Sequence, residues 1–132
     1  MKVGDRFFLR GAFDRESLAF LRQMGGEGAV VNIAGELAGN PQGTPAVSEA
    51  LAERLRSGPF WRAEDLRALR EAVNAHDLEL CSLAHTPPHR MQRILLGLPG
   101  RDEDIAHWCR SLEAMGEAGI PVLQYSWHLN VG

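Results

Sequence analysis

The chain has 132 residues, which is enough for one domain with a modest core. Its 45% hydrophobic and 23% charged residues are typical of a globular protein. A net charge of −3 offers no basic surface for nucleic acid, and no apolar run approaches the ~20 residues that span a bilayer. We therefore expect neither nucleic acid nor a membrane as a partner.

The first part of the chain alternates between strand and helix signals. Residues 2–9, KVGDRFFL, are rich in β-formers and predict a strand. A helix follows, with Asp14 as its N-cap, Glu16 in its first turn and a glycine-rich end at residues 25–28. Residues 29–34, AVVNIA, then predict a buried strand.

The middle of the chain contains two helices between long loops. Residues 35–45 are dense in glycine, proline and asparagine and predict a loop. Residues 46–56 predict a short helix, and residues 62–77 predict a stronger amphipathic one. Residues 78–85, LELCSLAH, predict a third strand. The long loop after it could form one or two helical turns near its middle.

A last helix and strand complete the pattern. Residues 102–117 predict a helix with apolar residues at i, i+3, i+4, i+7 and i+10. The residues of this expected face are Ile105, Trp108, Cys109, Leu112 and Met115. The acidic run at residues 101–104 suits the positive end of the helix dipole. Residues 117–127, EAGIPVLQYSW, predict a glycine turn and a fourth strand.

The predicted order is β-α-β-α-β-α-β, which indicates a parallel sheet with helical crossovers. Connections after strands two and three are long, as in parallel folds whose active sites lie at the carboxyl ends of the strands. The stretch after strand one, FFLRGAFD, has a single glycine, which disfavours a nucleotide-binding sheet. We predict an α/β fold that is the N-terminal half of a (β/α)8 barrel, incomplete, with residues 1–132 as one partial domain and no second domain.

The two cysteines, Cys81 and Cys109, fall in a predicted strand and a predicted helix. Neither belongs to a close Cys/His cluster with zinc spacing, so we interpret both as reduced thiols. Charges within the N-terminal MKVGDRFFLRG argue against a secretory signal. These features indicate a cytoplasmic location.

Several segments resemble the mannonate dehydratase family. Residues 95–125, LLGLPGRDEDIAHWCRSLEAMGEAGIPVLQY, resemble the family's Leu-Gly-Leu-Pro-x-Arg-Asp-Glu stretch, helix, Ala-Gly-Ile turn and apolar strand ending in tyrosine. Residues 87–97, PPHRMQRILLG, resemble its Pro-x-His segment, and residues 59–80 resemble its tryptophan-containing lead into a helix. RFF at residues 6–8 resembles an Arg-aromatic-aromatic run at the end of strand one.

The resemblance implies a xylose-isomerase-like barrel with hydro-lyase activity. The family removes water from D-mannonate to give 2-keto-3-deoxy-D-gluconate, a step of carbohydrate metabolism in glucuronate catabolism. It also implies Mn²⁺ or Fe²⁺, which would polarise the hydroxy-acid end of the substrate. The family's metal ligands come from later strands, so we expect them beyond Gly132, assign none here and expect this chain alone to be inactive.

Three histidines are candidates for the substrate site. His85 and His128 follow the predicted ends of strands three and four, and His89 matches the family's Pro-x-His segment. Imidazoles titrate near neutral pH and could act as acid or base, although polar rim residues with satisfied hydrogen bonds would look the same. We assign no catalytic residue.

Arg6 and Tyr125 are the other candidates for contacting a sugar acid. Arg6 could face the barrel interior and hold the carboxylate in a bidentate fork, or could pair with Asp5 or Glu79. Tyr125 could donate a hydrogen bond to the substrate or fill a barrel layer.

Departures from the family pattern keep other functions open. Ser126 and Trp127 stand where the family often has Asn-Phe, and Ala84-His85-Thr86 stands where Glu-Ser often precedes the Pro-x-His segment. The alternatives are a sugar isomerase or epimerase of the same superfamily, and a non-catalytic half-barrel binding module. An isolated half-barrel exposes strand edges, so it should dimerise, aggregate or remain partly molten, which allows a homo-oligomer.

Overall fold

The computed structural model describes residues 3–10, 13–36, 42–84 and 91–125. The predicted alternation of strands and helices is confirmed, and a short helix lies in the second long loop. The elements are β1 (Gly4–Arg10), α1 (Arg15–Gln23), β2 (Gly28–Glu36), α2 (Glu49–Ser57), α3 (Ala63–Asn74), β3 (Glu79–Ala84), α4 (Gln92–Leu96), α5 (Arg101–Glu117) and β4 (Val122–Gln124).

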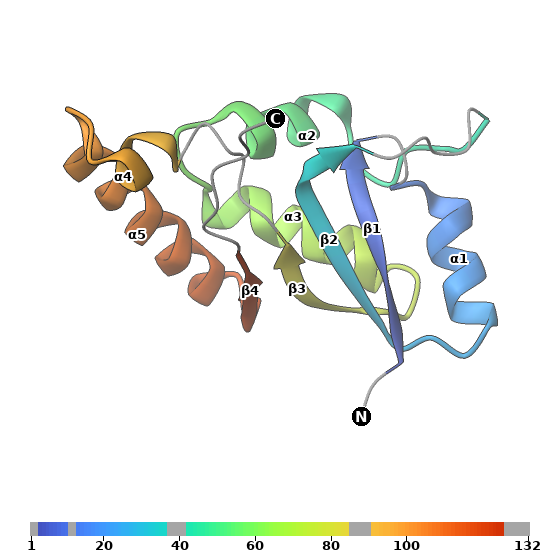
Figure 1. Ribbon diagram of the computed structural model, residues 1–132. Coiled ribbons are helices and arrows are strands. Elements are labelled where there is room, and N and C mark those ends of the chain that lie inside the picture. The colour runs from blue at the N-terminus through green and yellow to red at the C-terminus, as the bar shows by residue number, and fades with distance from the viewer. Residues whose placement is uncertain (1–2, 11–12, 37–41, 85–90, 126–132) are drawn as a thin grey trace.

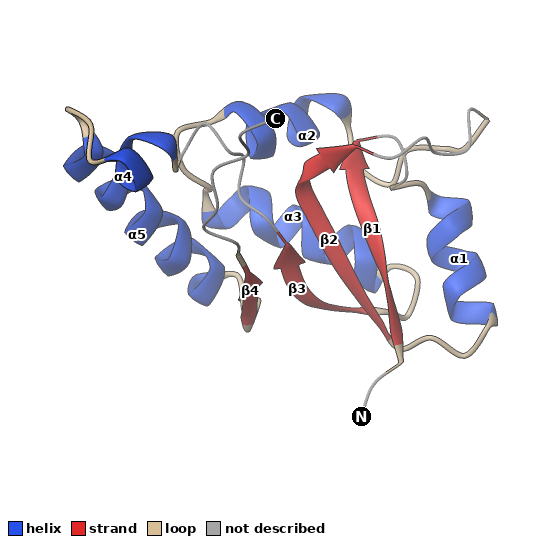
Figure 2. Ribbon diagram, in the orientation of Figure 1, coloured by secondary structure: helices blue, strands red, loops and turns tan. Residues whose placement is uncertain are grey.

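The four described strands form one parallel sheet in the order β1-β2-β3-β4. Figure 2 shows all four arrows pointing the same way. In Figure 1, α1 lies beside β1 at one end of the sheet, α5 lies beside β4 at the other, and α3 lies behind the strands. Each strand therefore reaches its neighbour through a helical connection, which confirms the predicted parallel α/β fold.

The hydrophobic core lies between the sheet and the helices. Alternate residues of the strands, such as Phe7, Val31 and Leu83, are buried in one cluster with helical residues such as Leu18 and Leu69. Because successive strand residues point to opposite faces, this alternation assigns one face of the sheet to the helices. The other face is free to carry polar groups.

Trp61, in the link between α2 and α3, joins α2 to α5 in that core. Its side chain is 1% exposed. The indole Nε1–H donates to the carbonyl oxygen of Leu55 at 3.0 Å, at the end of α2. The backbone N–H of Trp61 donates to Ser111 Oγ on α5 at 3.1 Å. Both polar groups are thus satisfied, as a buried tryptophan requires.

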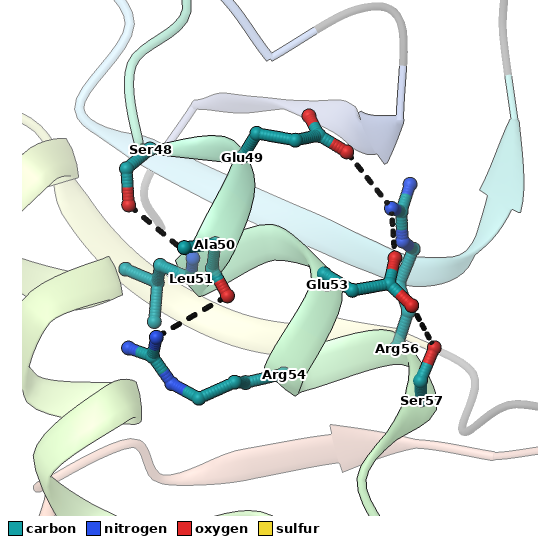
Figure 3. A network of polar contacts seen from close by, with 8 residues as sticks. All are labelled: Ser48, Glu49, Ala50, Leu51, Glu53, Arg54, Arg56 and Ser57. Carbon is teal, nitrogen blue, oxygen red and sulfur yellow. Dashed lines mark hydrogen bonds and ion pairs between the residues drawn. The ribbon is translucent and has the colours of Figure 1, made fainter.

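Polar contacts define the limits and surface of α2 (Figure 3). Ser48 is the N-cap, and its Oγ accepts from the N–H of Leu51 at 3.2 Å. Arg56, in the last turn, forms ion pairs with Glu49 at 3.2 Å and with Glu53 at 2.7 Å. The exposed surface of the helix is therefore held by charge pairing at helical spacing, which contributes a few tenths of a kcal/mol per pair.

Two arginine–aspartate pairs fasten neighbouring helices to each other. Arg54 of α2 donates through Nε and Nη2 to Asp65 of α3, at 2.9 and 2.7 Å. Arg93 of α4 donates through Nε to Asp104 of α5 at 2.7 Å and also pairs with it through Nη2. Both carboxylates are buried, and each is paired with an arginine, which compensates the charge placed there.

The predicted apolar face of α5 is wrong for most of its residues. Ile105 and Leu112 are 44% and 43% exposed, and Cys109 is exposed as well. The buried residues of the helix are Asp104, Ser111, Ala114 and Met115. The helix turns polar groups inward because Arg93 neutralises Asp104 and Trp61 donates to Ser111, so neither group is left unsatisfied.

Core burial makes a direct prediction for stability. Leu83→Ala removes a side chain that is 0% exposed, and we expect it to lower the free energy of unfolding by about 2–5 kcal/mol. Leu96→Ala, at a position 46% exposed, is the control and should change it by less than about 0.5 kcal/mol. Urea unfolding followed by circular dichroism measures both. Equal losses would contradict the assignment of the core.

Candidate functional site

The face of the sheet turned away from the helical core is called the inner face. Cross-strand registers place its residues in two rows. The first row is Arg6, Val30, Ser82 and Val122, and the second is Phe8, Asn32, Ala84 and Gln124. Polar side chains from all four strands thus share one surface, opposite the leucine-rich core.

A chain of hydrogen bonds crosses this inner face. The Nη2–H of Arg6, on β1, donates to Gln124 Oε1, on β4, at 2.8 Å. The Nε2–H of Gln124 donates in turn to Ser82 Oγ, on β3, at 3.3 Å. Gln124 therefore uses both ends of its amide, one to orient a guanidinium and one to anchor itself.

The bond between Arg6 and Gln124 requires a curled sheet. Two strands lie between β1 and β4, and neighbouring strands are ~4.8 Å apart, so a flat sheet would separate them by about 14 Å. Side chains on a flat sheet stand roughly parallel to one another and would not meet over that distance. The sheet is therefore concave on the inner face, with the helices on its convex side, which is the curvature of a β-barrel wall.

Arg6 has the chemistry of an anion-binding residue. A guanidinium carries five N–H donors in a planar fork that matches a carboxylate. Its described acceptor on the inner face is Gln124, and the side chain is exposed, so donors remain for a ligand. A neutral amide also leaves the positive charge of Arg6 uncancelled. Because Gln124 is neutral, a carboxylate that binds Arg6 does not have to displace another anion from this contact.

At the carboxyl ends of the strands, the connection after β1 is tied to the connection after β2. The Glu16 carboxylate accepts from the N–H of Thr44 at 2.8 Å and from its Oγ1 at 2.9 Å. The N–H of Arg15 donates to the carbonyl oxygen of Thr44 at 2.9 Å, and an antiparallel bridge joins Asp14 to Pro45. We call this set of contacts the Glu16–Thr44 clasp.

The clasp lowers the pKa of the Glu16 carboxyl below its ordinary value of 4.5, chiefly through the hydrogen bond from the backbone of Thr44. Glu16 also lies in the first turn of α1, whose N-cap Asp14 accepts from the N–H of Ser17 at 2.8 Å. The predicted N-cap and first-turn acid are thus confirmed, and Glu16 has a second, long-range contact in addition.

The described residues include two of the five predicted site residues. Arg6 lies on the inner face, as above. Tyr125, which directly follows β4, is 60% exposed, and its ring meets Trp108 of α5 edge-on with centroids 6.4 Å apart. His85, His89 and His128 lie outside the described residues.

Sequence reasoning missed Gln124 and Ser82 as partners of Arg6. Gln124 lies 118 residues from Arg6 along the chain, and no local pattern signals such a contact. The available signal is alternation: Leu123 packs against the core, which turns Gln124 to the opposite face. Once β4 is paired in register with β3, the same rule places Ser82 beside it.

The described part of the chain contains neither a metal-binding cluster nor a membrane-spanning helix. Within it, no three His, Cys, Asp or Glu side chains gather closely enough to hold a metal ion. The residues of the inner face described above are accordingly not a metal site by themselves. None of the described helices is long and apolar enough to cross a membrane.

Consecutive parallel β/α units, a sheet concave on its polar face and helices on the convex side define part of a β/α barrel of the TIM type. A family model described as D-mannonate dehydratase (UxuA) matches residues 1–132, and the chain therefore belongs to that family. Family membership makes the chain part of a hydro-lyase family, as its sequence resemblance implied.

The crystal structure of mannonate dehydratase from Streptococcus suis serotype 2 is similar in fold, with a TM-score of 0.66 and 27% identity. The match covers 95% of this chain and 30% of that one. The mannonate dehydratase of Streptococcus equi subsp. zooepidemicus is 36% identical over 70 residues, and that of Streptococcus pneumoniae is 34% identical over 70 residues. Each of these two matches covers 53% of this chain and 19% of the relative. The chain thus spans less than a third of the proteins that it matches.

The clasp predicts a pH dependence of stability. Since the folded protein lowers the Glu16 pKa, the clasp stabilises the fold above pH 4.5 and loses its contribution as the pH falls through the folded value. We expect Glu16→Gln to flatten the decline of the urea midpoint below pH 4.5 relative to wild type. Glu71→Gln, an equal charge change at an exposed position of α3, should leave the decline unchanged. Identical profiles for the two variants would contradict the clasp.

Proposed function

We propose that the protein acts as a dehydratase that converts D-mannonate into 2-keto-3-deoxy-D-gluconate. The observation that carries the proposal is an arginine on the inner face, held by a neutral amide, in a chain that belongs to the D-mannonate dehydratase family. The substrate is a sugar acid, so its carboxylate is the group that a guanidinium fork is suited to bind. The reaction belongs to sugar-acid catabolism.

The reaction removes a proton from C2 and the hydroxyl group from C3 of the substrate. The resulting enol, with its hydroxyl on C2, becomes the 2-keto product when C3 takes up a proton. Removing the C2 proton places negative charge on the adjacent carboxylate. In this proposal Arg6 binds that carboxylate. The electrostatic stabilisation that Arg6 provides grows as negative charge accumulates on the carboxylate in the transition state.

Gln124 and Ser82 act in this proposal as positioning residues for Arg6. An arginine side chain loses considerable rotamer freedom when it binds a ligand, and a preformed bond to Gln124 reduces that loss. Ser82 limits the freedom of Gln124 in the same manner. His85, His89, Tyr125 and His128 stay candidates for further contacts with the sugar acid.

The remaining parts of the proposal rest on family resemblance and composition. Residues 1–132 form one partial barrel domain, the protein works in the cytoplasm, and Mn²⁺ or Fe²⁺ is its metal. A site for that ion would need residues outside the described ranges, at least in part, since the described ones form no cluster of three ligands. No role in the steps above is assigned to the ion.

The activity test uses the protein expressed from its natural reading frame, assayed with D-mannonate and Mn²⁺ while 2-keto-3-deoxy-D-gluconate is followed. Formation of this product supports the proposal. If the protein does not dehydrate D-mannonate but converts a ketose, the proposed function is wrong and the protein is a sugar isomerase. For the 132-residue chain alone we expect no turnover with or without Mn²⁺, so robust turnover by that chain would overturn the expectation.

The role of Arg6 predicts a change in substrate binding. Arg6→Lys keeps the charge but loses the planar fork, so we expect the KM for D-mannonate to rise about tenfold or more, with a smaller change in kcat. The same substitution at Arg22, whose Nη1–H donates to the carbonyl oxygen of Gly26 at the end of α1, is the matched control. If the two variants change KM equally, Arg6 does not bind the substrate.

A further inference from the structure

A β-bulge interrupts the pairing of the two middle strands of the sheet, β2 and β3 (Figure 1). Ala29 of β2 lies opposite Leu80 of β3. The next residue of β2, Val30, lies opposite Ser82, so Cys81 is an extra residue on β3 without a counterpart on β2. Bulges are rare between parallel strands, and they redirect the side chains that follow them.

The extra residue changes which side chains of β3 reach the core. Leu78, Leu80 and Leu83 are buried in the core, so the spacing of core residues changes from two to three at the bulge. Ser82 is consequently turned to the inner face, where its Oγ accepts from Gln124. Unbroken alternation after Leu80 would place Ser82 among the helices and Leu83 on the inner face.

Two contacts fit Cys81 to this bulge. Its thiol donates to the carbonyl oxygen of Glu79 at 3.5 Å. Its sulfur also fills the space beside Gly28 of β2, where a Cβ added to that glycine would overlap it. Without the sulfur, the added Cβ would lie 3.6 Å from the Glu79 carbonyl oxygen and 3.8 Å from the Cys81 Cβ, which are ordinary van der Waals distances. The absence of a side chain on Gly28 therefore makes room for the sulfur of Cys81.

We propose that Gly28 and Cys81 are positioning residues for Arg6, and that they act through the bulge. The bulge turns Ser82 to the inner face, Ser82 anchors the amide of Gln124, and Gln124 orients the guanidinium. A shift of the bulge therefore changes the direction in which Arg6 presents its donors to a carboxylate. This inference rests on the proposed function, because it explains how the arginine assigned there is held.

Steady-state kinetics with D-mannonate and Mn²⁺, on the protein expressed from its natural reading frame, give the first test. Gly28→Ala presses a carbon against the Cys81 sulfur, so we expect the KM to rise about fivefold or more, with a smaller change in kcat. Cys81→Ala/Gly28→Ala removes the sulfur and should return the KM to within about twofold of wild type. A KM that stays raised in the double variant would contradict the contact.

Gly116→Ala is the matched control. This glycine lies in α5, and a Cβ added to it would have no described atom within 4 Å, so the KM should not change. Circular dichroism checks that each variant is folded. If Gly28→Ala does not fold, Cys81→Val enlarges the same contact from the other strand and should raise the KM in the same way.

A second comparison asks whether the effect of Gly28→Ala passes through Ser82. In a Ser82→Ala background the anchor of Gln124 is already missing, so adding Gly28→Ala should change the KM by less than about twofold. If Gly28 acted only on general stability, the substitution would raise the KM by the same factor in both backgrounds. Equal factors would overturn the proposal.

The coupling between Arg6 and Gln124, measured by a double-mutant cycle in urea unfolding, tests the bulge without catalysis. Gly28→Ala should lower this coupling by about half or more, and Cys81→Ala/Gly28→Ala should restore it. If wild type does not convert D-mannonate but the coupling responds in this way, the proposed function is wrong and the bulge still positions Arg6. If wild type is active and Gly28→Ala changes neither the KM nor the coupling, this inference is wrong.

Discussion

The rest of the structure depends on the curl of one parallel sheet. Arg6 on the first strand touches Gln124 on the fourth although two strands separate them, so the wall must be concave. The concave shape of the sheet separates the helices and the apolar core from the polar side chains. The helices and the apolar core occupy the convex side, while Arg6, Ser82 and Gln124 meet on the inner face.

The helices are held on the convex side by a few buried polar contacts in addition to apolar packing. Arg54 pairs with Asp65 between α2 and α3, Arg93 pairs with Asp104 between α4 and α5, and Trp61 links α2 to Ser111 of α5. These contacts use the inward side of α5 for polar groups. On the outward side of the same helix, Ile105 and Leu112 are exposed.

Local features were predictable from the sequence, and long-range ones were not. The cap at Asp14 and the alternating strands depend on neighbouring residues, so their patterns are visible in one short window. The burial of Asp104 and Ser111 depends on partners in other elements, so an apolar-face rule chose the wrong side of α5. Gln124 was missed for the same reason, because its partner Arg6 comes from the opposite end of the chain. Family resemblance supplied what single residues could not, namely the D-mannonate dehydratase family to which the chain belongs.

The most direct measurement is a double-mutant cycle between the first and fourth strands. Arg6→Met, Gln124→Met and the double variant are unfolded in urea, and their free energies of unfolding are compared. A concave sheet with the bond between Arg6 and Gln124 predicts a coupling energy of about 0.5–1.5 kcal/mol. Strictly additive effects would mean that these side chains do not meet, and the barrel curvature assigned to this chain would be wrong.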